Sequence, residues 1–209
     1  MGKEMREQRY ITCALFAVGL LAANSATAAE NGFYLGFSAG QARPSFDNNP
    51  RVAGGLPVQY DSSSGAWDAA AGYQINQYFG VEVRYVKFGD YNARIFVPGV
   101  GNLFTNIQIN AWGASLVGTA PLGRGFSLLG RVGENYTRET RGNCNICVTQ
   151  PTSSSDNVWS PSFGVGVKYD FNANWAVRGE AERFTRIGNN DNTFGGKVNL
   201  YTVGVTYKF

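Results

Sequence analysis

The sequence predicts an all-β fold, an eight-stranded antiparallel transmembrane β-barrel, and three observations support that prediction. The chain of 209 residues begins with a segment that has the order of an export signal. The remainder contains no apolar run near the roughly 20 residues that a membrane-spanning helix needs. Over most of its length it alternates between apolar and small or polar residues, as strands with one greasy face do.

Residues 1–29 are expected to be a cleaved signal peptide, and residues 30–209 to form the barrel domain. A basic start is followed by an apolar stretch from Ile11 to Ala23 and then by a run of small residues. Cleavage after Ala28 or after Ala29 satisfies the small-x-small rule, and we favour Ala29. The apolar stretch is too short to anchor the chain as a helix.

The final segment gives the clearest strand. Its odd positions from 201 to 209 are apolar or aromatic, and its even positions are small or polar. Successive side chains of a strand point to opposite faces, so one face of this segment is apolar. Aromatic residues at both ends of that face are typical of the interfacial girdles of membrane barrels.

Seven further strands are expected upstream. Six alternate clearly, and they begin near Phe33, Trp67, Phe79, Phe126, Phe163 and Trp175. The segment 107–120 is a strand by composition, but its phase is ambiguous: Ile107 and Ile109 share one face, whereas Trp112, Ala114 and Leu116 share the other. A β-bulge, or an aromatic side chain in the lumen, would reconcile the two phases.

The connections between these strands alternate in length. Short turns are expected at residues 76–78, 121–125 and 170–174, and long polar loops near residues 41–64, 89–106, 139–157 and 187–196. Short turns at one rim and long loops at the other match the periplasmic and extracellular ends of a bacterial barrel. Eight strands enclose a lumen that side chains can fill, and closure leaves no unpaired edge.

The composition argues against catalysis and against nucleic-acid binding. The chain has no histidine, and hydrolytic or acyl-transfer catalysis most often depends on an imidazole base. We therefore expect a non-enzymatic protein without cofactor or metal. Without residues 1–29 the chain keeps 15 of 18 basic and 13 of 15 acidic residues, a net charge of about +2 that gives no reason to expect a nucleic-acid partner.

Charged residues at lumen-facing positions form the main candidate site. They are Asp68, Glu82, Arg84, Arg131, Lys168, Arg178, Glu180 and Glu182. Unpaired charge is costly in a narrow lumen, so the residues are expected to pair. One interpretation is a packed network of salt bridges that fills the barrel. The alternative is an ion gate that opens when the pairs exchange partners.

Cys144 and Cys147 form a CxxC pair within the predicted loop 139–157. A zinc site would need a second pair of ligands, and a thioredoxin-like redox motif would need a βαβ context. The favoured interpretation is a structural disulfide in a tight surface loop, which an oxidising export route permits.

Four segments resemble the OmpA-type transmembrane domains and the related OmpX-like and opacity-type small barrels. They are Gly32–Gly40, Ala71–Tyr85, Ser162–Tyr169 and Val203–Phe209. The resemblance implies that the terminal residues are read by the barrel assembly machinery, and the matching positions are Val203, Val205, Tyr207 and Phe209. The sequence departs from full-length OmpA proteins by lacking their peptidoglycan-binding domain, so tethering to the cell wall is not expected.

The expected function is that of an integral barrel of the bacterial outer membrane. It would support envelope integrity and surface interaction or adhesion through its extracellular loops. Its partners would be outer-membrane lipid and lipopolysaccharide, the assembly machinery and a host or phage surface ligand, and the protein is expected to be a monomer. The alternative is a narrow porin-like channel gated by the lumen charges. A third hypothesis is a soluble periplasmic binding domain of the sandwich type.

Overall fold

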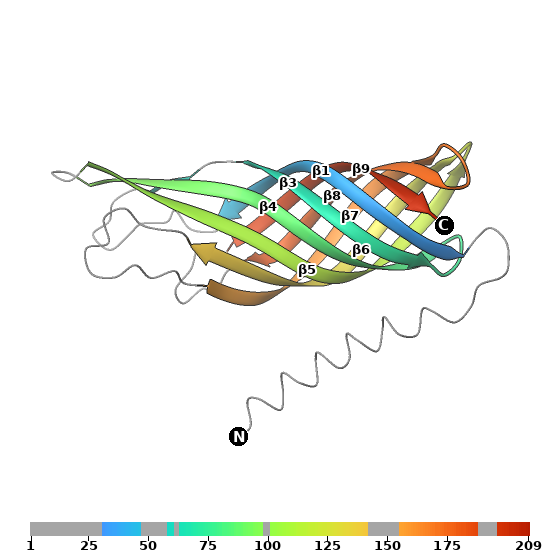
Figure 1. The fold of residues 1–209 in the computed structure, drawn as a ribbon, viewed down its shortest axis with the longest axis horizontal. Helices are drawn as coiled ribbons and strands as arrows, with labels where there is room; N and C mark the ends of the chain where they lie inside the picture. The colour runs from blue at the N-terminus through green and yellow to red at the C-terminus, as the bar shows by residue number, and fades with distance from the viewer. Residues whose placement is uncertain (1–30, 47–57, 61–62, 98–100, 142–154, 188–195) are drawn as a thin grey trace, which may run out of the picture.

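A computed structural model of the chain describes residues 31–46, 58–60, 63–97, 101–141, 155–187 and 196–209 (Figure 1). The predicted signal peptide, residues 1–29, lies outside the described residues. Among the described residues there is no helix long and apolar enough to cross a membrane.

Eight strands form a closed antiparallel barrel (Figure 1), which confirms the predicted fold class. They are β1 (Gly32–Phe46), β3 (Ser64–Gln74), β4 (Phe79–Val97), β5 (Gly101–Gly123), β6 (Phe126–Arg141), β7 (Ser155–Asp170), β8 (Trp175–Ile187) and β9 (Gly196–Lys208). Each strand pairs with the next in this order, and the pairing of β1 with β9 closes the ring. A three-residue strand, β2 (Val58–Tyr60), pairs with the far end of β4.

The turn end of the barrel is built by local hydrogen bonds. The side-chain oxygen of Asn76 accepts hydrogen bonds from the backbone N–H groups of Tyr78 and Phe79, at 2.8 and 2.9 Å. Asn172 does the same for Asn174 and Trp175, at 2.9 and 2.8 Å. An asparagine that bonds to the backbone two and three residues ahead fixes a tight reversal, so both turns have the short length that the sequence predicts.

The loop end differs from the prediction, because strands extend into segments expected to be loops. Strands β4 and β5 stay paired as far as Val97 and Gly101, and β1 continues to Phe46. The segments 41–64 and 89–106 are therefore not loops throughout. Alternation could not show this, because a strand that extends beyond the membrane has no need for an apolar face.

Two strands contain irregularities that change which residues face the lumen. The register shifts between Lys87 and Asp90 in β4, and between Phe184 and Ile187 in β8. In β4 the inward positions are even up to Phe88, and after Gly89, whose φ is 87°, Tyr91 is inward. Three strands separate β4 from β8 in either direction around the ring, so the two shifts lie on opposite walls.

The phase of the segment 107–120 is settled without a bulge. Its pairing with β4 and β6 is continuous from Ile107 to Gly118, apart from the shift within β4. Ile109 is buried in the lumen, whereas Trp112 is exposed on the outer face. Neither proposed reconciliation applies within this segment, because Ile109 packs in the lumen against the buried apolar cluster and the outward phase begins with Trp112.

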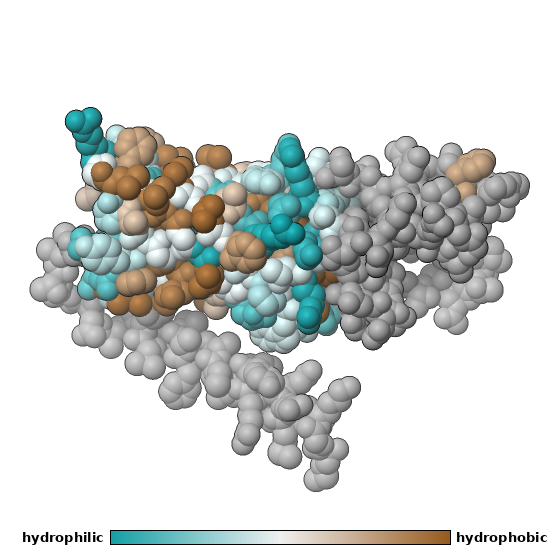
Figure 2. Space-filling view, turned by 180° about the vertical axis from the view of Figure 1, so that it is seen from behind, coloured by the Kyte–Doolittle hydropathy of each residue, from teal (hydrophilic) through white to brown (hydrophobic). Residues whose placement is uncertain are grey.

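The outer surface of the barrel exposes many large apolar and aromatic residues. On the face shown in Figure 2, apolar patches lie over the part of the barrel away from the loop end. Six neighbouring strands carry one diagonal row of exposed or half-exposed rings, namely Phe37, Trp67, Tyr85, Trp112, Tyr136 and Trp159. The printed ring contacts within it have centroids 4.6–6.0 Å apart. A second set, which includes Phe33, Tyr73, Trp175 and Tyr207, lies near the turns. Two aromatic sets that flank an apolar surface indicate where the lipid ends on each side.

Candidate functional site in the barrel lumen

The lumen is divided along its axis into three zones. Toward the turns lies a cavity of about 390 Å³, bordered by Tyr34, Lys168 and Arg178 among others. A charged layer follows. Beyond it, toward the loops, lies a buried apolar cluster of Ala42, Ala66, Val86, Phe88, Tyr91, Ile109, Ala111, Phe184, Ile187, Val198 and Leu200.

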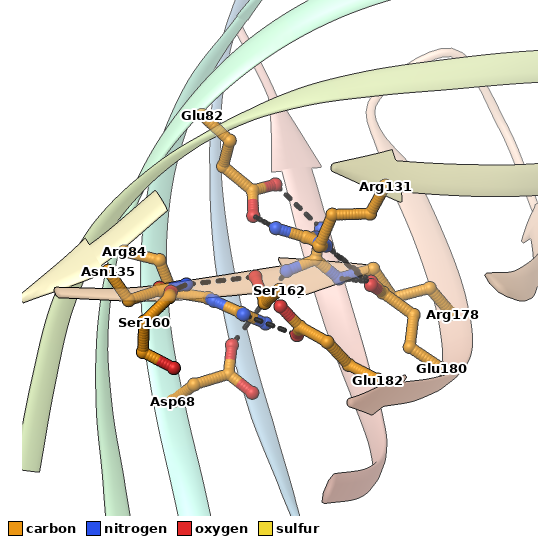
Figure 3. Close-up of polar contacts among 10 residues, drawn as sticks. All are labelled: Asp68, Glu82, Arg84, Arg131, Asn135, Ser160, Ser162, Arg178, Glu180 and Glu182. Atoms are coloured by element: carbon orange, nitrogen blue, oxygen red, sulfur yellow. Dashed lines mark hydrogen bonds and ion pairs between the residues drawn. The ribbon is translucent and has the colours of Figure 1, made fainter. Parts of the chain in front are cut away.

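Strand parity brings the charged residues together (Figure 3). Glu82 and Arg84 from β4, Arg131 from β6, and Arg178, Glu180 and Glu182 from β8 project into one layer, which Asp68 from β3 borders. Residues two apart on a strand point to the same side, so each strand delivers its charges inward together. Seven of the eight residues named from the sequence therefore lie in one layer.

Glu82 is one member of a closed ring of four ion pairs with Arg131, Glu180 and Arg178. Its Oε1 lies 2.6 Å from Arg131 Nη1, and its Oε2 lies 2.8 Å from Arg178 Nη1. Glu180 joins the same two arginines from the other side, with Arg131 Nε and Arg178 Nε each 3.0 Å from its carboxylate. The Arg131 contact is a hydrogen bond, whereas the Arg178 Nε contact is an ion pair without hydrogen-bond geometry.

Arg84 and Glu182 form a separate ion pair that links β4 directly to β8. Both side chains are almost fully buried. The guanidinium of Arg84 also lies over the ring of Phe184, 6.0 Å from its centroid. This pair is therefore the point at which the charged layer meets the apolar cluster.

Asp68 is the least satisfied member of the layer. Its residue is 1% exposed, and neither carboxylate oxygen has a hydrogen-bond partner among the described residues. Its closest ion-pair contact is Arg178 Nη2 at 3.9 Å. The layer thus holds four carboxylates, those of Asp68, Glu82, Glu180 and Glu182, against three guanidinium groups.

Lys168 does not join this layer. Its Nζ lies 3.2 Å from Asp170 Oδ1 at the end of β7, and its side chain is one-quarter exposed. It borders the cavity near the turns instead. Inward parity places a residue on the lumen side of a strand, but the level along the axis depends on the shear between strands, which the sequence does not show.

Several polar residues in the lumen were not singled out from the sequence. Tyr34 Oη donates a hydrogen bond of 3.1 Å to Glu82 Oε2. Asn135 Nδ2 donates to Ser162 Oγ at 2.8 Å and to the carbonyl oxygen of Ser160 at 3.2 Å. Their inward parity is visible in the alternation, so that signal could have found them. Among the described residues no group of three or more potential ligands is placed to hold a metal ion.

The other predicted site residues have different positions. Val203, Val205 and Phe209 are exposed on the outer face, and the Tyr207 ring contacts Phe209 edge to face at 5.0 Å. Cys144 and Cys147 lie outside the described residues.

The sequence matches the model of one known protein family. The model for the outer membrane protein beta-barrel domain matches residues 13–209, nearly the whole chain. The chain belongs to this family. Its location is the bacterial outer membrane.

One curated relative is Outer membrane protein A from Yersinia pseudotuberculosis, which is 29% identical over 208 residues. The match covers 95% of this chain but 54% of the relative, so the chain spans about half of that protein's length. The activities and partners of the complete relative are therefore not assigned to this chain.

Solved structures share the fold at low identity. Neisserial surface protein A aligns with a TM-score of 0.61 at 16% identity, covering 85% of this chain and 97% of its own. OprG from Pseudomonas aeruginosa gives 0.56 at 18%, covering 87% and 96%. The attachment invasion locus protein Ail of Yersinia pestis gives 0.53 at 16%, covering 88% and 100%. These likenesses show the fold, a small closed β-barrel.

Proposed function

We propose that this family member is a non-enzymatic, closed barrel of the outer membrane that supports envelope integrity and presents its loops for surface interaction. The observation behind the proposal is the stacking of two buried layers in the lumen. The ion pairs of Glu82 fill one level, and the cluster around Phe88 and Phe184 fills the next.

A conducting pore needs a continuous hydrated path, and the two layers oppose one. Moving an ion past the charged layer requires breaking buried ion pairs, and leaving one buried partner unpaired costs about 3–5 kcal/mol. The next level is filled mainly by apolar side chains, beside the buried Thr137 and Glu139 of β6, so most of the ion's hydration would be lost without replacement. An ion that crosses the lumen must pass both layers, so the two free-energy costs add.

The absence of histidine supports the non-enzymatic part of the proposal. The surface role is supported by the fold shared with a protein named for the cell surface and with one named for attachment and invasion. Ail has also been crystallised with the heparin analogue sucrose octasulfate. A sulfated or phosphorylated saccharide of host or bacterial surfaces is therefore the first ligand class to test on the loops.

Conductance and phenotype test this proposal together. Refolded protein in planar lipid bilayers should give no discrete openings, and a gene deletion should increase envelope permeability or reduce surface attachment. A strain complemented with the intact gene is the control. Regular single-channel openings, together with a deletion strain unchanged in both screens, would contradict the proposal.

The second candidate is a narrow channel gated by the charged layer. It is favoured by one observation: Arg131 and Arg178 each contact both Glu82 and Glu180, so each arginine has an alternative partner in place. Openings that appear in the intact protein and change in frequency in Glu82→Gln would support a gate. Glu134→Gln, an exposed outward glutamate on β6, is the control.

Two processing events belong to the same proposal. We expect removal of residues 1–29 and a disulfide between Cys144 and Cys147. Intact mass of protein recovered from the outer membrane tests both, since alkylation without reduction should then add no mass. Cleavage after Ala28 instead of Ala29 would change the mass by one alanine.

A further inference from the structure

A cationic site lies on the lipid-facing side of the barrel, where β8, β9 and β1 meet near the loops. Arg183 on β8 and Arg43 on β1 both pair in register with Asn199 of β9, one from each side. Neighbouring strands lie about 4.8 Å apart, so the two arginines begin within about 10 Å of one another. Arg186 follows Arg183 on the same strand, and Lys197 precedes Asn199.

Within the described residues of these three strands, no free acidic side chain balances the charge of this site. Glu180 and Glu182 are the only acidic residues in β1, β8 and β9, and both are engaged by arginines in the lumen. Within the described chain no ion pair involves Arg43, Arg183 or Arg186. Arg43 and Arg186 are exposed, and Arg183 is partly exposed.

The site lies at the border of the apolar surface. On β1 the outward residues are Phe33, Leu35, Phe37 and Ala39, followed by Gln41 and Arg43. At about 3.3 Å per residue and a strand tilt of about 40°, the ten residues from Phe33 to Arg43 rise about 25 Å, the height of the apolar band of such barrels. Figure 2 shows hydrophilic surface between the apolar band and the loop end on the face it presents.

The aromatic row is also interrupted here. It runs over β1, β3, β4, β5, β6 and β7, but β8 carries Ala181 and Arg183 at its outward positions in this region. On β9 the corresponding ring is Tyr201, and the guanidinium of Arg43 lies over it, 5.8 Å from the centroid. A ring beneath a guanidinium limits its freedom while leaving its N–H donors available.

A shallow groove of about 350 Å³ runs beside this pair and is bordered by Gln41, Arg43, Tyr201 and Val203. Its floor includes Glu180, whose carboxylate is held in the lumen by Arg131 and Arg178. The groove therefore combines an apolar wall toward the membrane with the guanidinium of Arg43 at its loop-side end. An amphiphile with a charged headgroup has a matching arrangement, with an apolar chain on one side and a charged group at its end.

We propose that Arg43, Arg183 and Arg186 bind the phosphorylated headgroup of a lipid in the outer leaflet, with an acyl chain along the groove beside Tyr201. Arginine is suited to phosphate because its planar fork donates two parallel hydrogen bonds. The inference rests on the membrane location and on the orientation in which the loops are outermost. It gives the proposed lipid contact a defined place on the barrel.

The test titrates refolded protein in neutral detergent with bisphosphorylated lipid A and counts bound lipid by native mass spectrometry. Arg43→Gln/Arg183→Gln/Arg186→Gln should weaken binding by about tenfold or more, as expected when several charge-assisted contacts are lost. Arg124→Gln/Lys168→Gln/Lys208→Gln, with the same change in charge but at the turn end of the barrel, should bind as the unsubstituted protein does.

Two further arms identify the ligand chemistry. Lipid A without phosphates should bind the unsubstituted protein about as weakly as the triple variant binds the complete lipid, and inorganic phosphate should not displace the lipid. Equal weakening by both triple variants, undiminished binding of the phosphate-free lipid, or displacement by inorganic phosphate would each overturn the inference. Heat-modifiable gel migration verifies folding, and Arg43→Gln alone serves if the triple variant does not fold. Because this assay does not involve the loops or conductance, its failure would leave the proposed closed-barrel function intact.

Discussion

The rings of Phe88 and Phe184 meet edge to face across the lumen, with centroids 4.8 Å apart. They come from opposite walls of the barrel, and each is fully buried. Phe88 lies within the register shift of β4, and Phe184 is the last paired residue before the shift of β8. The contact therefore joins two walls at the level where both strands change their inward phase.

Removing this contact should destabilise the barrel. Phe88→Ala is expected to lower the free energy of unfolding by about 3–5 kcal/mol, the usual cost of deleting a buried ring. Urea unfolding followed by tryptophan fluorescence gives the value. Phe96→Ala, an exposed ring beyond the shift in the same strand, is the matched control and should change stability little.

Asp68 should be a source of instability. Asp68→Asn removes a buried charge without a hydrogen-bond partner, and we expect the free energy of unfolding to rise by about 1–3 kcal/mol. Glu82→Gln, at a carboxylate with two arginine partners, should instead lower it by about 3–5 kcal/mol. If Asp68→Asn lowers the free energy of unfolding as Glu82→Gln does, the carboxylate of Asp68 stabilises the barrel and this prediction is wrong.

The pair of Arg84 and Glu182 should show strong coupling. Arg84→Met and Glu182→Gln each leave one buried charge alone, so each should destabilise by about 3–5 kcal/mol. The double variant should be more stable than the sum of the two losses predicts, by about 0.5–3 kcal/mol. A double-mutant cycle of unfolding free energies measures this coupling, and a value of zero would show that the two side chains act independently.

Gly72 should be intolerant of a side chain. A Cβ at this position would lie 2.2 Å from the ring of Tyr34, whose hydroxyl reaches Glu82. Gly72→Ala should therefore move Tyr34 and cost about 1–3 kcal/mol of unfolding free energy, as overpacking does. Gly130→Ala is the matched control, since a Cβ there meets nothing within 4 Å. Equal effects of both variants would refute the steric explanation.

Phe209 should matter more for assembly than for stability. Deleting it should reduce the amount of folded barrel in the outer membrane several-fold, if the terminal aromatic is read during assembly. Phe171→Ala is the control: Phe171 is 61% exposed against 68% for Phe209, and each contacts a tyrosine edge to face. Heat-modifiable gel migration of outer-membrane fractions measures both, and similar losses would argue against a terminal signal.

Alternation was sufficient to predict the barrel and the turn end. Because a lipid-facing side chain and a lumen-facing one differ so strongly in polarity, parity identifies the inward face of β3, β6 and β8 over most of their length. The same parity predicts that Glu82 and Arg178 face the lumen, as they do in the structure. The two asparagine turns, at Asn76 and Asn172, follow from equally local chemistry.

The pairing within the lumen could not be predicted in this way. Which arginine meets Glu82 depends on the shear of the closed sheet, a property of all eight strands together. Tyr91 illustrates a second limit: it was expected in an outer loop, but the shift at Lys87–Asp90 turns it into the apolar cluster. A bulge is a non-local outcome, since it forms only where the neighbouring strands favour it.

The cavity near the turns and the apolar cluster near the loops make the molecule unequal along its axis. Among the described residues, a small polar reagent entering from the periplasmic side would reach Arg178 through this cavity, whereas the lumen toward the loops is filled mainly by the apolar cluster. The lumen therefore has a cavity at its turn end and packed side chains beyond it. A label confined to one compartment would find chemically different surfaces at its two ends.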